Sequence, residues 1–253
     1  MRVILTSDAS HMGAVSAAIA TNCLRKSLRD QARARIVVAT GASQFEVLAN
    51  LASQPDIDWS RVEGFHLDEY VGIAIDHQAS FCGYLRSRFV EACQPAKFHY
   101  LHGDANPVET IAAVGSELQK APIDLLLCGI GENGHLAFND PPADLETQDP
   151  YLIVELDDQC RQQQVGECWF ETLDDVPTHA MSMSINQILQ AKNLICSVPD
   201  TRKAEAVRAT LEDPISPSIP ASVLRRCEQA TLVIDEAAAS RLSDSVRSTL
   251  QSP

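Results

Sequence analysis

The sequence predicts a single α/β domain built around a mostly parallel β-sheet. Short apolar runs alternate with helical patterns along the chain, and the interior runs are apolar without interruption. Such alternation is typical of β–α–β units, and continuously apolar strands are typical of a sheet that is covered on both faces. With 253 residues, 45% of them hydrophobic, one large domain is favoured over two small ones.

The predicted elements follow one another in regular order. Strand-like runs are 3–6, 35–40, 62–67, 98–101, 123–130, 151–156, 180–184, 193–198 and 230–234. Helical patterns between them are 14–27, 43–53, 80–92, 107–120, 185–190, 201–210 and 237–250. Residues 141–177 interrupt the alternation, because they are rich in Asp, Gln, Glu and Pro and contain one clear strand. Long irregular segments in a compact domain are often lids, although this composition fits a polar surface excursion nearly as well.

Composition excludes several classes of function. The net charge of −14 argues against nucleic-acid binding, which needs clustered Lys and Arg. No apolar run approaches the roughly 20 residues that span a membrane, and the first strand is too short for a signal-peptide core. The eight cysteines form no Cys-x-x-Cys pair and are predicted to be reduced core thiols. We therefore expect a cytoplasmic protein that binds neither nucleic acid nor membrane; a homo-oligomer is compatible with the sequence.

The segment Gly129–Pro141 is the strongest candidate for a site. It follows the apolar run 123–128, and ligands of open α/β sheets lie outside the carboxyl ends of the strands. Its glycines, including Gly134, let the backbone turn and approach a substrate closely. His135 can move protons near neutral pH, and Asp140 can orient it or balance its charge. A bare Gly-x-Gly is more often a surface turn, but this density of Gly, His, Asn and Asp favours a site.

Two more segments carry chemistry at predicted strand ends. Thr40, Gly41, Ala42 and Ser43 lie between a strand and a helix, where free backbone N–H groups bind anions; Ser43 is equally suited to capping that helix. The segment is neither a Walker loop nor a dinucleotide fingerprint. Because the chain is acidic, a phosphate site must be locally positive or be built from N–H groups. The pair Asp68 and Glu69 follows another strand, although paired acids there usually face solvent.

Three motifs together resemble the glucosamine-6-phosphate deaminase (isomerase) family, within the 6-phosphogluconolactonase superfamily. They are residues 38–43, residues 65–72 with 76–81, and residues 129–141, in the family's order; weaker similarity runs from about 2 to 236. The resemblance implies a modified Rossmann-like three-layer sandwich with a lid within 141–177, and a small-molecule sugar phosphate as ligand. We expect no organic cofactor. We also expect no metal, because no His/Asp/Glu set has convincing ligand spacing; His66, His77, His102 and His179 are predicted to be structural or on the surface.

The resemblance also implies roles for individual residues. Asp68 corresponds to the base that takes the C2 proton of the open-chain amino sugar and returns it at C1, with Glu69 behind it. His135 corresponds to the histidine that opens the pyranose ring. Lys203 corresponds to a phosphate-binding lysine, although Arg202 is an equally good cation by chemistry.

The sequence departs from the family pattern near His135. Asn133 stands where an Asp is usual, and Asp140 stands where a Glu, one methylene longer, is usual. We expect these two residues to weaken ring opening, because Asn carries no charge and Asp140 reaches the histidine only if its loop lies further inward. The lid arginine of the family has no clear match, and Arg161 is the nearest candidate.

The predicted reaction converts glucosamine 6-phosphate and water to fructose 6-phosphate and ammonia. Galactosamine 6-phosphate, which differs at C4, is an alternative substrate that the sequence does not separate. A 6-phosphogluconolactonase and a non-catalytic sugar-phosphate sensor are two further candidate functions. Residues 137–141 and 70–72 favour the deaminase over the lactonase. The two departures and the unmatched arginine keep the sensor as an alternative.

Overall fold

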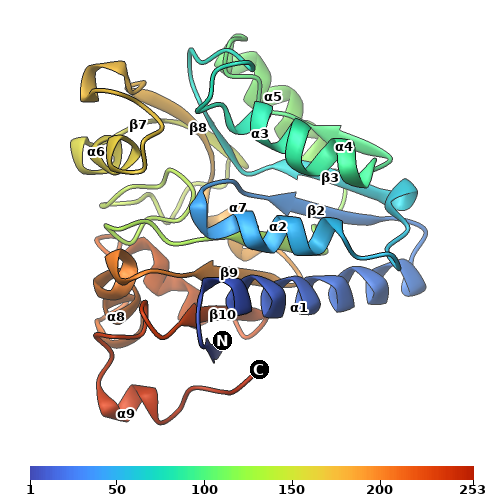
Figure 1. Cartoon of the computed structure of the whole chain (residues 1–253). Coiled ribbons are helices and arrows are strands. Elements are labelled where there is room, and N and C mark those ends of the chain that lie inside the picture. The colour runs from blue at the N-terminus through green and yellow to red at the C-terminus, as the bar shows by residue number, and fades with distance from the viewer.

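A seven-stranded sheet, all parallel, forms the centre of the molecule in the computed structural model, which describes residues 1–253 (Figure 1). Its strands, in spatial order, are β1 (Arg2–Thr6), β10 (Ala230–Asp235), β9 (Leu194–Val198), β6 (Leu125–Cys128), β2 (Ala34–Val38), β3 (Val62–His66) and β5 (Lys97–His99). The predicted α/β class and parallel sheet are therefore confirmed. The carboxyl ends of β2, β6 and β9 lie side by side, which brings the loops that follow them together.

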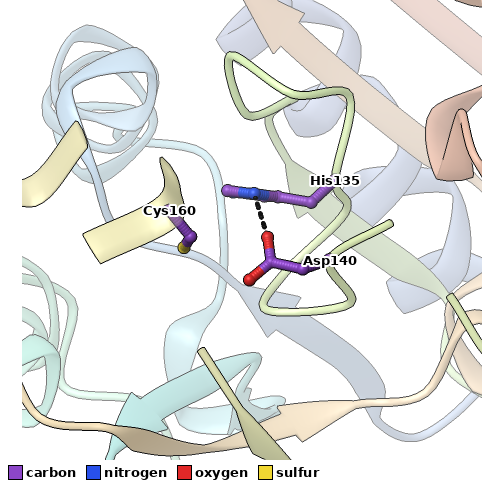
Figure 2. A group of neighbouring side chains, drawn as sticks. All are labelled: His135, Asp140 and Cys160. Carbon is purple, nitrogen blue, oxygen red and sulfur yellow. Dashed lines mark ion pairs between the residues drawn. The ribbon is translucent and has the colours of Figure 1, made fainter. Parts of the chain in front are cut away.

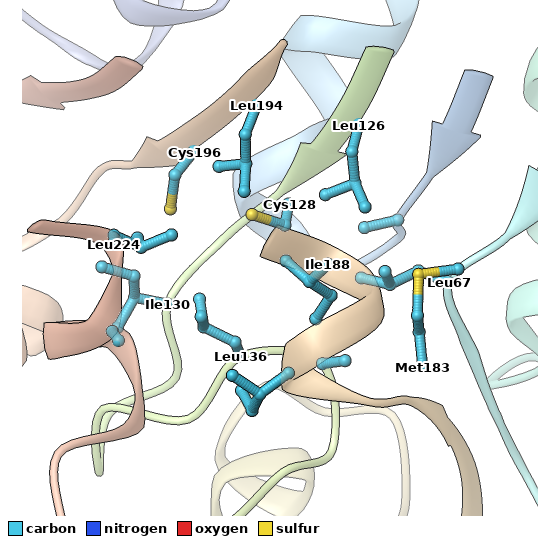
Figure 3. Close-up of a cluster of buried hydrophobic side chains, with 14 of the residues drawn as sticks. Leu67, Leu126, Cys128, Ile130, Leu136, Met183, Ile188, Leu194, Cys196 and Leu224 are labelled. Carbon is cyan, nitrogen blue, oxygen red and sulfur yellow. The ribbon is translucent and has the colours of Figure 1, made fainter. Parts of the chain in front are cut away.

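Helices cover both faces of this sheet. One face carries α1 (Ala9–Asp30), α2 (Phe45–Ala52), α3 (Phe81–Leu85), η3 (Arg86–Val90) and α4 (Glu91–Cys93). The other carries α5 (Pro107–Leu118), α7 (Ile185–Leu189), α8 (Ala204–Glu212) and η6 (Pro220–Arg226). Alternate residues of one strand point to opposite faces of the sheet. Leu125 and Leu127 of β6 therefore pack against the α1 side, whereas Leu126 and Cys128 pack on the α5 side, in the cluster that Figure 3 shows. Continuously apolar strands are the result.

A smaller sheet lies beside the carboxyl ends of the large one. It is antiparallel, in the order β4 (Asp68–Tyr70), β8 (His179–Met183) and β7 (Tyr151–Glu155). The covering segment, residues 141–177, contains β7, α6 (Asp158–Gly166) and η4 (Leu173–Asp175). A separate cluster of 9 buried residues, with Tyr70 and Phe170 among them, joins this segment to the small sheet. No helix is both long and apolar enough to cross a membrane.

Several element predictions were wrong in detail. The runs 151–156 and 180–184 join the antiparallel sheet rather than the parallel one, and the supposedly irregular covering segment contains α6. The predicted helix 237–250 is reduced to α9 (Asp244–Arg247). The carboxylate of Asp235 accepts from the N–H of Ala238 at 2.7 Å and so favours a turn there, while Ser243 caps a new helix by accepting from Val246 N–H. Short 3₁₀ segments complete the chain: η1 (Ala42–Gln44), η2 (Trp59–Arg61) and η5 (Thr201–Lys203).

All eight cysteines are free thiols. Six are buried, as predicted, but Cys23 is only half-buried and Cys168 is exposed. Cys168 lies just after α6 with a φ of 62°, at a turn whose direction places its side chain outside the packed cluster.

Candidate active site

One pocket collects most of the predicted site residues. It lies where the loops after β2, β6 and β9 meet the small sheet and α6. Its lining includes Thr40, Gly41, Ala42, Ser43, Asp68, Gly129, Gly131, His135, Gln163, Gln164, Glu167, Asp200, Arg202 and Lys203. Segments that are far apart in the sequence therefore meet at the carboxyl edge of the sheet, as expected for this class. Glu69, Asn133, Gly134 and Asp140 do not line it, and neither do the four histidines predicted to be structural or on the surface.

The loop after β2 forms one wall of the pocket. Gly41 has a φ of 91°, which an L-residue rarely adopts, and the chain then turns through η1 into α2. Ser43 does not cap either helix, and no other side chain does. The N–H groups of this turn are thus left for a ligand, and Thr40 Oγ1 is buried without a hydrogen-bond partner. Gly129 makes room for this wall, since a Cβ there would lie 2.5 Å from Ser43 Oγ.

Lys203 and Arg202 differ in their availability to a ligand. The Arg202 guanidinium is held by the Asp200 carboxylate at 3.0 Å and lies 3.8 Å from Glu132. Lys203 is only 8% exposed, lines the pocket and forms no ion pair within 4.0 Å. Burial lowers the pKa of Lys203, an effect that the charges of Glu167 and Glu132 oppose. Lys203 is therefore the more available of the two cations in this pocket.

Arg161 does not replace the family's lid arginine. Its guanidinium donates to the carbonyl oxygens of Leu173 and Val176 and pairs with Asp158. Arg161 therefore links α6 to other residues of the covering segment and does not face the pocket. The pocket instead receives the carboxylate of Glu167 from the end of α6. The surroundings of Lys203 are consequently not strongly positive, and the N–H groups of the loop after β2 become the main alternative source of anion binding.

Asp68 lies where the chain crosses from the large sheet to the small one. β3 ends at His66, and Asp68 begins β4, paired with Ser182 of β8. Its side chain lines the pocket, and Oδ1 is buried without a hydrogen-bond donor. Burial and then the neighbouring Glu69 charge raise the pKa of Asp68 to about 8. An unsatisfied carboxylate with a raised pKa has the properties of a general base.

Glu69 points away from the pocket, contrary to its predicted place among the binding residues. It is fully buried and accepts from the N–H groups of Tyr70, Phe81 and Cys82 and from Ser80 Oγ. Because successive residues of a strand face opposite sides, only one of the two acids can reach the pocket. Burial raises the pKa of Glu69 to about 7 in spite of these four hydrogen bonds. Glu69 thus fixes the start of α3 and, with it, Phe81 in the pocket wall.

His135 and Asp140 form a close pair beside the pocket (Figure 2). His135 Nδ1 lies 2.9 Å from Asp140 Oδ1, so the shorter carboxylate does reach the ring in this loop conformation. Although burial opposes ionisation, His135 and the amide of Asn133 hold the pKa of Asp140 below its ordinary value. Gly131 allows the ring to lie against the backbone, since a Cβ there would be 2.3 Å from the imidazole.

Asn133 acts on this pair indirectly. Its Nδ2 donates to Asp140 at 3.0 Å, and its Oδ1 accepts from the His135 backbone N–H at 3.1 Å. It forms no hydrogen bond with the imidazole, so the structure places Asn133 behind the pair, and its predicted catalytic role stays a prediction. Gly134, with a φ of 87°, supplies the turn between Asn133 and His135 rather than a surface for a ligand.

The helix α6 forms a further wall of the pocket, which was not predicted from the sequence. Cys160, Gln164 and Glu167 lie on one face of this helix, at the spacing i, i+4 and i+7. Figure 2 shows Cys160 on α6 beside His135 and Asp140, and the potential ligand atoms of these three residues lie within 4.8 Å of one another. Burial and then Asp140 raise the pKa of the Cys160 thiol. The stretch 157–167 is polar and has few apolar residues, so no clear helical period marks this wall in the sequence.

Known proteins with similar sequences belong to one family. The model of glucosamine-6-phosphate isomerases/6-phosphogluconolactonase matches residues 7–233. A glucosamine-6-phosphate deaminase of an Arthrobacter species is 33% identical, over 100% of this chain and 97% of its own. One of an Exiguobacterium species is 34% identical, over 83% and 81%.

Solved structures agree with this match. A monomeric glucosamine-6-phosphate deaminase superposes with a TM-score of 0.85 at 27% identity, covering 95% of this chain and 99% of the other. A 6-phosphogluconolactonase of Trypanosoma brucei shares the fold, with a TM-score of 0.78 at 17% identity and coverage of 96% and 98%. The chain belongs to the family of glucosamine-6-phosphate isomerases and 6-phosphogluconolactonases.

Proposed function

We propose that this protein is a glucosamine-6-phosphate deaminase, which converts glucosamine 6-phosphate and water to fructose 6-phosphate and ammonia. The observation that carries the proposal is that Asp68 and His135 line the same pocket as Lys203 and the loop Thr40–Ser43. A proton-transfer pair and an anion site share one enclosed space, as a phosphorylated sugar requires. Relatives that are 33% and 34% identical bear the name of this activity.

The chemistry divides among these residues. The N–H groups of the Thr40–Ser43 turn and Lys203 hold the 6-phosphate. His135, kept in place by Asp140, takes the proton of the C1 hydroxyl and delivers it to the ring oxygen, and the ring opens to the C1 aldehyde. Asp68 then removes the C2 proton and returns it to C1, which converts the aldose amine into a ketose imine. Water adds to the C2 imine and ammonia leaves.

The raised pKa of Asp68 suits this sequence of steps. Without substrate in the pocket, a pKa of about 8 means that Asp68 is protonated in most molecules at neutral pH. The substrate carries an ammonium group on C2, directly beside the proton to be removed. A positive charge at that position favours the carboxylate, so the substrate itself activates the base.

Two alternatives lose support. The lactonase structures resemble this chain at identities such as 17%, which establishes the fold and no more. The sensor rested partly on the departures at Asn133 and Asp140, and the 2.9 Å contact between Asp140 and His135 supplies the negative charge that those departures seemed to remove.

The covering segment, residues 141–177, is proposed to act as a lid. α6 contributes Gln163, Gln164 and Glu167 to the pocket, so a substrate of sugar-phosphate size enters most readily when this helix moves away. Few hydrogen bonds join α6 and its N-cap to the loop 129–141. Gln163 Oε1 accepts from Glu132 N–H at 3.1 Å, and Asp157 N–H donates to Asp140 at 3.4 Å.

Ammonia release from a panel of sugar phosphates tests the function. We expect release from glucosamine 6-phosphate, none from Asp68→Asn under the same conditions, and no hydrolysis of 6-phosphogluconolactone. Hydrolysis of the lactone without deamination of any amino-sugar phosphate would replace the proposal with lactonase activity. Binding without turnover, measured by calorimetry, would favour the sensor.

A further inference from the structure

Three consecutive glutamines on α6 have different surroundings. Gln162 is exposed to solvent. Gln163 is occupied on both sides of its amide, since Oε1 accepts from Glu132 N–H at 3.1 Å and Nε2 donates to Glu167 at 2.9 Å. Gln164 is only 5% exposed and lines the pocket, but its amide forms no hydrogen bond with the protein. The helix therefore presents one amide to the pocket whose donor and acceptor form no hydrogen bond with the protein.

An amide that faces a pocket and has no protein partner is available to a ligand. The few polar groups that line a ligand pocket fix the orientation of the ligand. Because Gln164 faces the pocket rather than the core, the group that satisfies it is expected to come from a ligand.

The position of Gln164 along the helix indicates which part of a ligand it meets. Cys160, one turn earlier, lies beside the reacting pair His135 and Asp140. Glu167, one turn later, lines the pocket at the end where its charge acts on Lys203. With a rise of about 1.5 Å per residue, Gln164 stands about 6 Å from the first position and about 4.5 Å from the second. It is thus level with the middle of the pocket, between the proton-transfer end and the phosphate end.

We propose that the side-chain amide of Gln164 binds the C4 hydroxyl of the open-chain substrate and selects the configuration at that carbon. This inference rests on the proposed function, which places C1 and C2 near Asp68 and the 6-phosphate near Lys203. C4 is then the carbon midway between the two ends. An amide both donates and accepts, which matches a hydroxyl, whose oxygen accepts while its hydrogen donates.

The selection follows from geometry. Glucosamine 6-phosphate and galactosamine 6-phosphate differ only in the side of the carbon chain on which this hydroxyl lies. A fixed amide on one wall reaches the hydroxyl of one epimer and leaves that of the other unpaired. Sites built to bind a substrate hydroxyl reject compounds that fail to supply it there.

The test compares kcat/KM for glucosamine 6-phosphate, its 4-deoxy analogue and galactosamine 6-phosphate. For the wild type we expect a loss of about 10- to 100-fold on the 4-deoxy compound and at least as large a loss on galactosamine 6-phosphate. Gln164→Leu should lose about as much on glucosamine 6-phosphate and show no further loss on the 4-deoxy compound. Gln162→Leu, the exposed neighbour, should behave like the wild type. If Gln164→Leu still discriminates against the 4-deoxy compound as the wild type does, Gln164 does not bind this hydroxyl.

Two measurements keep the outcome decisive. Circular dichroism shows whether Gln164→Leu folds. If it does not, kinetics of the wild type still test the proposal, because equal kcat/KM for glucosamine 6-phosphate and its 4-deoxy analogue would overturn it. If no amino-sugar phosphate is turned over, the proposed function fails separately. Calorimetric binding of 2-amino-2-deoxyglucitol 6-phosphate and its 4-deoxy analogue then tests Gln164, with equal affinities as the contradicting result.

Discussion

The large parallel sheet and the covering segment build the same pocket from very different amounts of core. The sheet is packed between clusters of 35 and 21 buried residues, whereas the part of the covering segment around α6, residues 156–176, shares a cluster of 9 with the small sheet. The sheet side supplies Lys203 and the loop Thr40–Ser43, and α6 supplies Gln164 and Glu167. Regions with few buried contacts open at lower free energy than the global core. The comparison indicates a rigid side that positions the reacting groups and a second side that can admit the substrate.

The largest effect is expected where the two regions meet. Asp68→Asn keeps the shape of the side chain but removes the base, so kcat should fall by at least about 10²- to 10⁴-fold. Steady-state kinetics measures the loss. Calorimetric binding of the reduced alditol, 2-amino-2-deoxyglucitol 6-phosphate, serves as the control and should be nearly unchanged. Turnover close to that of the wild type would assign the base to another residue.

The two regions should respond differently to cavities in their cores. Leu126→Ala, in the large sheet, should lower the free energy of unfolding by about 2–5 kcal/mol. Phe170→Ala, in the small cluster, should change global unfolding less but raise KM, because it loosens the covering segment without opening the main core. Urea unfolding and steady-state kinetics on both variants test the contrast. Equal losses of global stability would show that both regions unfold as one unit.

Substitutions of Lys203 and Arg202 test which of these two cations binds the phosphate on the rigid side of the pocket. Lys203→Ala should raise KM by about 10- to 100-fold and change kcat less, because a phosphate remote from C1 and C2 contributes mainly uniform binding. Arg202→Ala should change KM much less, since its guanidinium is already held by Asp200. The reverse order of effects would transfer the phosphate contact to Arg202.

The pH dependence of stability reports on the burial of Asp68. Its pKa is about 8 in the folded state and near 3.8 when unfolded, so the folded state binds the proton more tightly. The contribution of Asp68 is therefore favourable at low pH and is lost as the pH rises toward 8. Asp68→Asn should gain thermal stability over the wild type progressively from pH 5 to 8, and the gain should level off above that. A gain that does not vary with pH would contradict the buried, raised-pKa carboxyl.

The smallest effect is expected at the two departures from the family pattern. Asn133→Asp combined with Asp140→Glu should change kcat by less than about threefold, because Asp140 already lies 2.9 Å from His135. The sequence predicts the opposite result, a gain in kcat, because these residues are expected from the family pattern to weaken ring opening. A pH–rate profile of the double variant against the wild type measures the effect, and a large gain in kcat would show that the two residues do weaken that step.

The contrast between the two regions also explains what the sequence could predict. Apolar runs such as 125–128 are local signals, and the strand-end motifs around Asp68 and His135 carry chemistry that can be interpreted in place. The role of Gln164 could not be predicted, because its surroundings depend on where α6 docks, and α6 has few apolar residues to mark it. Glu69 and Asn133 were misplaced for a related reason. Which of two adjacent polar residues faces a pocket is decided by backbone direction and by hydrogen bonds such as those from Tyr70 and Cys82 N–H.

The hydrogen bond between Gln163 and the N–H of Glu132 bears on the rate of turnover. If α6 moves to release the product, this bond and the contact from Asp157 to Asp140 must break and reform in every catalytic cycle. Where this opening is slower than the chemical steps, it limits the rate of turnover, and turnover then slows in viscous solvent. The same side chain that helps shape the pocket would also set how often the enzyme completes a cycle.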